Sequence, residues 1–369
     1  MPDKRIRVAI IGAGWAGHTH ARFYKRVPFV DVVGWADMVP GKAAAAAAEH
    51  GVPAEGVYED YERMFKELEL DAVSVCTFNM GHREPTIAAL EAGKHVLLEK
   101  PMAATLPDAQ AIMRTWEQRQ GQILMVGFQP DFSAEHQAAK QIVDSGALGD
   151  IYYAEAVTHR RWNVPGGNFV KKSTAGAGTL VDTGVYAIHN ALWMMGDPKP
   201  VAVTGITGNP LTKAYKGVKN AFGGPWTAKD MEVEEYAFAF VRFENDAAMT
   251  VKSTWTANTE SLGRSYFLGT KAGLALRPLE VYQNLQYGGE LNMTSTVANL
   301  DLTDDWNKSW TAKMQTFAEA VRDGKPSPID PRGVFLVNVI MDGILRSAET
   351  GREVAVDASY MPSAAGART

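Results

Sequence analysis

The sequence has little cysteine, little excess of charge and no long apolar run. Its 369 residues include one cysteine, Cys76, which excludes a disulfide framework and a zinc site built from thiolates. The formal net charge of −5 argues against a general affinity for nucleic acid or anionic membranes. No apolar run has the length of a membrane span, and the start MPDKRIRVAII lacks the regions of a signal peptide. We expect a cytoplasmic protein without nucleic-acid or membrane partners, with Cys76 in the core.

Sequence patterns for metal binding and for a catalytic nucleophile are also missing. The eight histidines have no metalloprotease spacing, and His18 and His20 have no nearby thiolate or carboxylate partner in the chain. No nucleophile elbow is present. We therefore expect no metal site. The remaining composition, 46% hydrophobic and 21% charged, is that of an ordinary globular protein long enough for two domains.

The most informative segment that is present is VAIIGAGWAG, residues 8–17. Its three glycines follow an apolar strand pattern and precede a helix pattern, in the spacing G-x-G-x-x-G. In such a loop the first glycine permits a tight turn, the second lets the backbone approach a pyrophosphate, and the third allows close packing of helix on strand. The expected cofactor contacts in this loop are Gly12, Gly14, Trp15, Ala16 and Gly17.

A carboxylate about 20 residues further on completes this pattern. Asp37 ends the second predicted strand, where a carboxylate accepts hydrogen bonds from the ribose hydroxyls of NAD and repels a 2′-phosphate. No arginine follows within the next four residues, although Lys42 lies one helical turn on. An ordinary turn aspartate is the alternative. The pattern favours NAD over NADP.

The first third of the chain alternates strands with helices. The expected strands are 5–11, 30–35, 72–77, 95–98 and 123–127, and the expected helices are 18–24, 42–50, 61–68, 84–92 and 107–118. This alternation predicts an α/β domain over residues 1–128, a Rossmann fold with a doubly wound parallel sheet.

The pattern changes beyond about residue 130, where strands follow one another without helices between them. Strands are expected over 151–161, 201–207, 234–243, 247–256 and 264–269, and helices over 135–145, 310–323 and 332–350. Residues 129–369 are therefore predicted to form an α+β domain with an open, mostly antiparallel sheet. We expect the helix at 332–350 to pack back on the first domain.

Two further segments carry side chains suited to proton transfer. Glu99 and Lys100 follow a predicted strand at the sheet edge where doubly wound folds bind ligands, and a cis bond from Lys100 to Pro101 is expected to be feasible. In residues 175–196, helical periodicity from Thr179 places Asp182, Tyr186 and His189 on one face. These groups can polarise and deprotonate a sugar hydroxyl. A surface lysine and satisfied amphipathic side chains are the structural alternatives. The glycines of this segment, including Gly184, would allow close approach to the cofactor or the substrate.

Together these segments resemble the glucose–fructose oxidoreductase/inositol dehydrogenase (Gfo/Idh/MocA) family. The resemblance covers nearly the whole chain and includes GAGWAGHTHAR, TFNMGHREPTIAALEAGKHVLLEKP, GAGTLVDTGVYAIH and GALGDIYYAEA. It implies that the second domain has an open sheet used for assembly into a homo-oligomer, a dimer or tetramer. It also implies a catalytic Lys100, a substrate-facing Asp182, and a cofactor border formed by Thr77, Asn79, His82, Glu99 and Lys100.

The chain departs from the family pattern at three positions. Many members have histidine at Tyr186 and aspartate at His189, and Asp131 replaces the arginine usual in GFQPDF. Tyr186, His189 and Lys100 all remain candidates for the proton acceptor. An unperturbed tyrosine has a pKa near 10, so Tyr186 would need a neighbouring cation to act as a base.

A basic segment that begins at the end of the strand at 151–161 lies, by this resemblance, over the substrate mouth. It contains Arg160, Arg161, Trp162 and Lys171, which suit an anionic sugar such as a uronate, a sulfonated sugar or a phosphate. A solvated basic loop is the alternative.

These observations predict an NAD-dependent oxidoreductase that moves hydride between nicotinamide and a hydroxyl of a sugar, polyol or sugar derivative. The alternative is an NAD-dependent glycosidase that oxidises its sugar transiently and eliminates the aglycone, acting on a sulfonated or carboxylated glycoside. A non-catalytic NAD-binding regulator would have no need for Lys100, Asp182 and Tyr186. The residues alone do not separate the two enzymatic readings.

Overall fold

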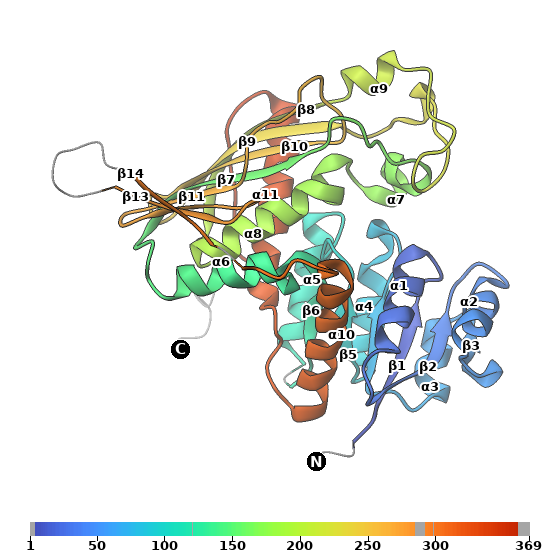
Figure 1. Ribbon diagram of the computed structural model, residues 1–369. Coiled ribbons are helices and arrows are strands. Elements are labelled where there is room, and N and C mark those ends of the chain that lie inside the picture. Colours follow the sequence, from blue (N-terminus) through green and yellow to red (C-terminus); the bar gives the residue numbers. More distant parts are fainter. Residues whose placement is uncertain (1–3, 120, 285–291, 298, 361–369) are drawn as a thin grey trace, which may run out of the picture. The chain divides into compact units, whose positions relative to one another are not determined.

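The computed structural model describes residues 4–119, 121–284, 292–297 and 299–360, which form two compact units (Figure 1). Unit 1 comprises residues 1–129, 306–335 and 359–369, and unit 2 comprises 130–305 and 336–358. The first segment of unit 1 thus ends at residue 129, next to the expected boundary between residues 128 and 129. Unit 1 also takes in the helix at 306–323, which was expected in the second domain, whereas the final helix is divided between the units at residues 335 and 336.

Unit 1 is built on a six-stranded parallel sheet with the order β3-β2-β1-β4-β5-β6. This order, with its reversal between β1 and β4, is that of a Rossmann fold, and it confirms the predicted doubly wound sheet. The strands are β1 (Ile6–Ile11), β2 (Val30–Ala36), β3 (Val57–Tyr58), β4 (Ala72–Val75), β5 (His95–Leu98) and β6 (Leu124–Val126).

Helices connect these strands, and most of their bounds lie within one or two residues of the predicted ones. They are α1 (Trp15–Tyr24), α2 (Lys42–His50), α3 (Tyr61–Glu67), α4 (Arg83–Glu91) and α5 (Leu106–Glu117). The largest difference is at α1, which begins three residues before the predicted start at His18 because the helix starts directly after Gly14. Cys76 is buried beneath this layer, as expected.

Unit 2 is built on a nine-stranded sheet with the order β14-β13-β12-β11-β7-β10-β9-β8-β15. Every neighbouring pair is antiparallel except β7 and β10, so the predicted mostly antiparallel sheet is confirmed. The strands are β7 (Ile151–His159), β8 (Pro200–Gly208), β9 (Tyr236–Phe243), β10 (Ala248–Thr254), β11 (Tyr266–Gly269), β12 (Gly273–Ala275), β13 (Glu280–Asn284), β14 (Asn292–Thr296) and β15 (Val354–Ala355).

One face of this sheet is covered by helices of the same unit. Helix α8 (Val185–Met195) packs on β7, and Gly205 of β8 lies close enough to α11 (Pro331–Thr350) that an added Cβ would be 3.1 Å from the Ile344 side chain. Helix α6 (Ala134–Asp144) also belongs to unit 2.

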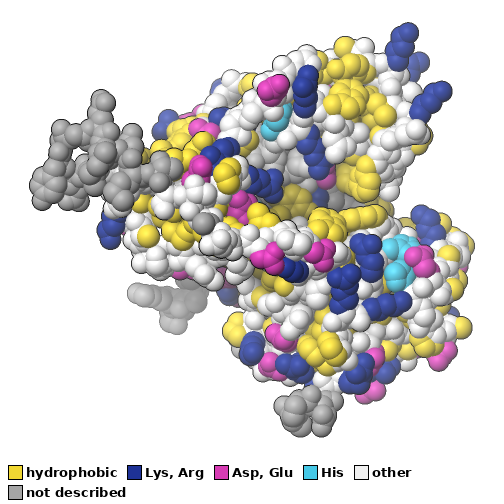
Figure 2. All heavy atoms as spheres, in the orientation of Figure 1, with side chains coloured by type: hydrophobic (Ala, Val, Ile, Leu, Met, Phe, Trp, Pro, Cys, Tyr) yellow, Lys and Arg dark blue, Asp and Glu magenta, His cyan; other side chains and the backbone are white. Residues whose placement is uncertain are grey.

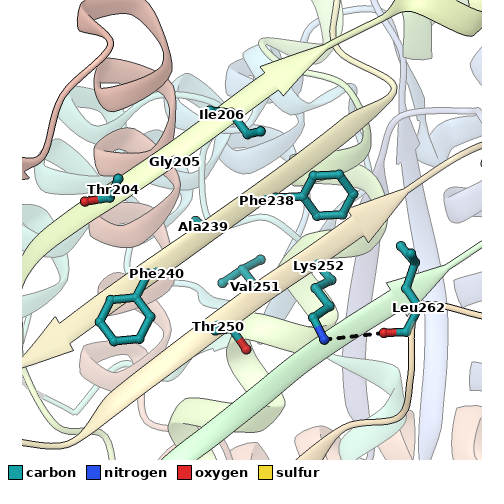
Figure 3. Close-up of a pocket in the computed structure, with 10 residues that line it drawn as sticks. All are labelled: Thr204, Gly205, Ile206, Phe238, Ala239, Phe240, Thr250, Val251, Lys252 and Leu262. Carbon is teal, nitrogen blue, oxygen red and sulfur yellow. Dashed lines mark hydrogen bonds between the residues drawn. The ribbon is translucent and has the colours of Figure 1, made fainter.

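The opposite face of the sheet carries an apolar depression (Figure 3). Its lining residues come mainly from β8, β9 and β10, where side chains alternate with those that face the helices, as strand geometry requires. Ile206 in this lining is 58% exposed. The lining consists of Thr204, Gly205, Ile206, Phe238, Ala239, Phe240, Thr250, Val251, Lys252 and Leu262.

The surface of each unit mixes charges of both signs on the face that Figure 2 shows. This agrees with the small net charge of the sequence. Among the described residues, no helix has both the length and the apolar content needed to cross a membrane.

Candidate functional site

The glycine loop of unit 1 has the geometry that a pyrophosphate site requires. Gly12 has a φ of +103°, and a Cβ there would lie 2.5 Å from the Cys76 carbonyl oxygen. A Cβ on Gly17 would lie 2.1 Å from the carbonyl oxygen of Gly12. A Cβ on Gly14 would meet nothing within 4 Å, so this glycine borders open space at the uncapped start of α1. The first and third glycines thus serve packing, and the second leaves room for a ligand.

Asp37 lies beside this loop at the end of β2. Its Oδ2 accepts a hydrogen bond from the backbone N–H of Ala13 at 2.7 Å, and its Oδ1 accepts one from Val39 at 2.9 Å. A carboxylate has about four acceptor sites, so these two bonds leave capacity for the hydroxyls of a ribose. The loop is also held by Trp35, whose indole N–H donates to the Gly12 carbonyl at 3.2 Å.

The segment after β4 contains three residues predicted to border the cofactor. The Thr77 hydroxyl donates to the Gly81 carbonyl at 2.7 Å and closes the turn at Asn79–Gly81. His82 is fully buried, and its ring nitrogens lie 2.8 Å from the Pro101 carbonyl and 3.2 Å from that of Thr77. Burial lowers the pKa of His82, so the neutral ring has one N–H to donate. The ring of His82 thus joins two loop segments, and a cofactor contact at this residue stays a prediction.

Glu99 follows β5 and lies in a buried network of charges. Its Oε1 accepts from Nζ of Lys313 and from Nε2 of His20, both at 2.8 Å, and Lys313 is fully buried. Burial alone would raise the pKa of Glu99, but the Lys313 ammonium and the His20 hydrogen bond hold this pKa well below its usual value. Burial, reinforced by Lys313, lowers the pKa of His20 to about 4. At neutral pH the network is therefore a carboxylate, an ammonium and a neutral imidazole.

This network fixes the segment that carries the predicted catalytic lysine. Lys100 is the next residue after Glu99, is half-buried, and is joined to Pro101 by a cis peptide bond, as the sequence allowed. Glu99 was predicted to line the nicotinamide side. Its carboxylate is directed at Lys313 in the interior of unit 1. A contact of Glu99 with nicotinamide and a catalytic role of Lys100 both stay predictions.

Helix α10 (Asp305–Asp323) supplies residues to this side of unit 1 that the sequence reasoning missed. Trp310 stacks edge-on with Trp15 of the glycine loop at 6.1 Å between ring centroids, and Lys313 Nζ lies 3.7 Å from the Trp310 ring centroid. The signal in the sequence was a lysine on the apolar face of an amphipathic helix, between Trp310 and Phe317, where a charge needs a buried partner.

In unit 2, the segment that leads into α8 begins with a π-helical turn, Leu180–Gly184, instead of the regular helix expected from Thr179. Such turns close i→i+5 hydrogen bonds and are frequent at functional sites. Asp182 in this turn accepts from the indole N–H of Trp255 at 2.8 Å and lies 3.6 Å from an Arg160 guanidinium nitrogen. The π turn changes the spacing between Asp182 and the residues of α8.

Two glycines of this segment serve the unit's own packing, and their approach to a cofactor or substrate stays a prediction. A Cβ on Gly178 would lie 1.9 Å from the carbonyl oxygen of Glu234, and one on Gly184 would lie 3.0 Å from Oγ of Ser253. The buried Glu234 carboxylate accepts from the backbone N–H groups of Gly178 and Leu180 at 2.8 and 3.0 Å. Glu234 thus caps the turn that presents Asp182.

Tyr186 and His189 follow in α8 and have different environments. Tyr186 is half-buried, whereas His189 is 3% exposed and its Nε2 lies 2.7 Å from Oδ2 of the buried Asp131. Asp131 is the residue that replaces the arginine usual in the family. The structure gives it a partner that the sequence reasoning did not foresee, because His189 lies 58 residues away.

The basic loop of unit 2 divides into paired and exposed residues. Arg160 is engaged by Asp182, whereas Arg161 and Lys171 are exposed. Trp162 is 46% exposed and meets Tyr215 edge-to-face at 4.5 Å between ring centroids. The loop therefore offers an aromatic surface flanked by two exposed cations.

The residues present fit the cofactor that the sequence predicts. An open glycine at the start of α1, a carboxylate at the end of β2 and the 3-2-1-4-5-6 strand order define a dinucleotide-binding fold, and a separate α+β unit carries further polar side chains. The class of protein so defined is an NAD-binding oxidoreductase.

Comparison with known proteins makes this assignment specific. Residues 6–128 match the family described as "Oxidoreductase family, NAD-binding Rossmann fold", and residues 136–275 match the "GFO/IDH/MocA C-terminal domain". The chain belongs to the Gfo/Idh/MocA family of oxidoreductases, as the sequence motifs indicated.

Two curated relatives are similar over most of the chain. A D-glucoside 3-dehydrogenase of Escherichia coli (strain K12) is 32% identical over 96% of this chain and 98% of its own length. A scyllo-inositol 2-dehydrogenase (NAD(+)) of Bacillus subtilis (strain 168) is 25% identical over 88% of each chain. The predicted NAD-dependent oxidoreductase of the sugar and polyol dehydrogenase type is confirmed, and the glycosidase alternative gains no support from these relatives.

A solved structure supports the fold. Levoglucosan dehydrogenase in complex with NADH has a TM-score of 0.81, covers 96% of this chain and 100% of its own, and is 22% identical. At this identity the likeness concerns the architecture of the two units.

Proposed function

We propose that this chain oxidises a hydroxyl group of a glucoside or a related sugar, with NAD⁺ as the hydride acceptor. The observation that carries the proposal is Lys100, held at the C-terminal edge of the unit 1 sheet by the buried Glu99–Lys313–His20 network. The similarity to a glucoside dehydrogenase over nearly the whole chain supports this substrate class.

The proposed roles follow from how exposed each side chain is. Bound NAD⁺ would supply the hydride acceptor, and Gly14 and Asp37 would hold its pyrophosphate and ribose. Lys100, which is half-buried, accepts the proton of the sugar hydroxyl. Asp182 and the half-buried Tyr186 orient the sugar, and Trp255 fixes the Asp182 carboxylate. His189 is buried against Asp131, so it positions α8 and is not the proton acceptor.

The variant Lys100→Met tests this assignment. It should lower kcat by at least about a thousandfold, within the range of general acid–base catalysis, while the Kd for NAD⁺ changes little. Lys66→Met, at an exposed lysine on α3 of the same unit, is the matched control. NADH formation monitored by absorbance with a panel of glucosides and inositols gives kcat, and calorimetry gives the Kd. Undiminished kcat in Lys100→Met would refute the proposal.

The exposed cations of the basic loop suggest where a charged substituent of the sugar would lie. We propose that Arg161 and Lys171 contact such a group, whereas Arg160 serves Asp182. The kcat/KM ratio between a glucuronide and the matching uncharged glucoside should fall in Arg161→Gln. A ratio that does not change in this variant would show that the loop is merely solvated.

The apolar face of the unit 2 sheet supports the homo-oligomer expected from the family resemblance. An exposed Ile206 beside Phe238 and Phe240 is the kind of surface that protein interfaces cover. Ile206→Asp should yield a smaller species in light scattering, and Leu302→Asp, at a residue 51% exposed outside the sheet, should not. An unchanged mass in Ile206→Asp would exclude this face. The cytoplasmic location stays a prediction from the sequence.

A further inference from the structure

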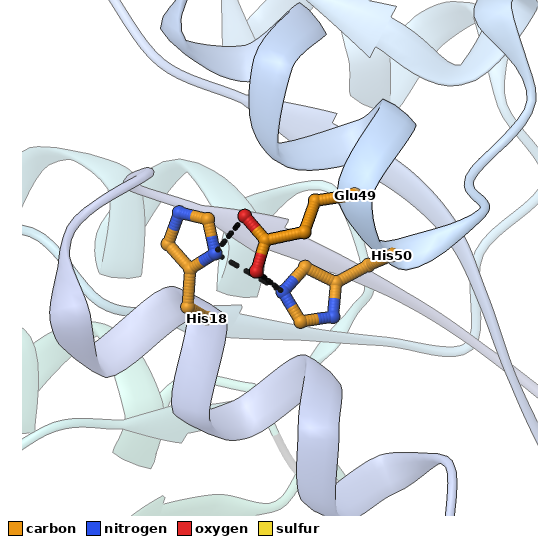
Figure 4. A group of neighbouring side chains, drawn as sticks. All are labelled: His18, Glu49 and His50. Atoms are coloured by element: carbon orange, nitrogen blue, oxygen red, sulfur yellow. Dashed lines mark hydrogen bonds and ion pairs between the residues drawn. The ribbon is translucent and has the colours of Figure 1, made fainter.

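A second cluster of polar side chains lies on unit 1 and contains none of the proposed catalytic residues. His18 of α1 and Glu49 and His50 of α2 converge there, and Figure 4 shows both rings turned toward the Glu49 carboxylate. The sequence-based expectation that His18 has no carboxylate partner is wrong, because the packing of α1 on α2 brings Glu49 to it.

The distances within this cluster match those between the ligands of one metal ion. His18 Nδ1 lies 3.0 Å from His50 Nε2 and 3.4 Å from Glu49 Oε2, and His50 Nε2 lies 3.6 Å from Glu49 Oε1. With bonds of about 2.0–2.1 Å in tetrahedral geometry, neighbouring ligand atoms around Zn²⁺ are roughly 3.3 Å apart. Two imidazoles and a carboxylate are an established ligand type for this ion.

Both imidazoles are held in place by the core beneath them. The His18 and His50 rings lie 5.5 and 5.4 Å, between centroids, from the ring of the fully buried Trp35. Metal ligands whose rotamers are fixed by packing are preorganised, which lowers the entropic cost of binding.

The cluster offers a cation one carboxylate and two imidazole nitrogens. Lys25 and Arg22 lie close enough to His50 to act on it electrostatically, and Glu49 opposes them. The single carboxylate of Glu49 supplies the negative charge of the cluster. The positive charges of Lys25 and Arg22 weaken the electrostatic attraction of the site for a metal ion but do not take up its ligand atoms.

We propose that His18, Glu49 and His50 form a zinc site with a coordination position open to water. It joins α1 to α2 on the outside of unit 1, and Trp35 connects it to the glycine loop through the hydrogen bond to Gly12. The site is separate from the proposed catalytic residues and does not depend on the proposed function.

Zinc binding to the chelator-treated, tag-free enzyme tests the proposal. Equilibrium dialysis at micromolar Zn²⁺, with metal analysis of the retained protein, should show one saturable zinc per chain. Zinc should also raise the melting temperature of the wild-type enzyme, because an ion that binds only the folded state stabilises it. Co²⁺ in its place should give the strong visible absorption of a four-coordinate site.

Variants separate this site from incidental binding. Glu49→Gln changes an exposed side chain, so it leaves folding intact while it removes a ligand, and His50→Gln removes a half-buried ligand. Both should lose saturable zinc binding and the gain in melting temperature. Glu91→Gln, at an exposed glutamate on α4, and His95→Gln should behave as the wild type.

Two results would overturn the proposal: wild-type enzyme that retains no saturable zinc, and Glu49→Gln that binds zinc as tightly as Glu91→Gln. The first result would leave His18 and His50 as a hydrogen-bonded pair that shares one proton. Because the readouts are metal content, melting temperature and absorption, failure here is distinguishable from failure of the dehydrogenase assignment.

Discussion

Replacing Lys313 by methionine should destabilise unit 1 more than any change to a surface lysine. The lysine is fully buried, its ammonium lies 2.8 Å from Glu99 Oε1, and it sits 3.7 Å from the centroid of the Trp310 ring. Methionine fills most of the same volume but leaves the Glu99 carboxylate buried, with the neutral His20 as a donor.

The expected magnitude follows from this geometry. Removing one partner of a buried ion pair costs about 3–5 kcal/mol, because the remaining charge is uncompensated. The matched control is Lys325→Met, which breaks an ion pair with Asp323 at 3.1 Å in which the lysine side chain is 64% exposed. Pairs of that kind contribute about 0–1 kcal/mol.

Guanidinium unfolding monitored by tryptophan fluorescence measures both variants. A double-mutant cycle with Glu99→Gln adds a specific test, since the double variant has no orphaned charge and should lose less than the sum of the single variants. A loss below about 1 kcal/mol in Lys313→Met, or additive losses in the cycle, would refute the interpretation of this network.

Three further predictions concern pH, the glycine loop and the π turn. The pKa of His20 in the folded protein is about 4, below the ordinary 6.5, so the unfolded chain takes up the proton first as the pH falls. The free energy of unfolding should therefore drop by about 2 kcal/mol between pH 7 and pH 5. In His20→Gln, the free energy of unfolding measured against pH should lack this drop. Gly17→Ala should lower the melting temperature because its Cβ meets a carbonyl oxygen at 2.1 Å, whereas Gly14→Ala should keep it and weaken NAD⁺ binding in calorimetry. Trp255→Phe should lower kcat/KM roughly 10- to 150-fold, since a hydrogen bond to a charged group such as Asp182 contributes roughly 1.5–3 kcal/mol; an unchanged kcat/KM would remove Asp182 from the site.

The sequence was sufficient for the features that depend on local pattern. Alternating apolar runs gave the two sheets, and the bounds of α2 at Lys42–His50 were predicted to the residue because an alanine run between glycines forms a helix with clear ends. The spacing of the glycines and Asp37 likewise marked the cofactor loop.

The features that were missed depend on contacts between distant residues. Lys313 meets Glu99 across 214 positions, and His189 meets Asp131 across 58. Neither pairing has a periodic signature. The π turn before α8 was missed for another reason: the segment has helical periodicity, and the Leu180 N–H of the turn is held by Glu234, which lies in another part of the chain.

The way unit 1 is assembled sets an order for its synthesis. Its sheet is complete once residue 126 has been made, yet the cation that neutralises Glu99 arrives with Lys313, after the ribosome has produced all of β7 to β14. During synthesis, the part of unit 1 that is made first therefore contains Glu99 without the lysine that neutralises it, until unit 2 has been largely produced. A fragment that ends at residue 129 would accordingly lack the buried partner of Glu99. A fusion protein designed to carry unit 1 therefore needs the α10 segment as well.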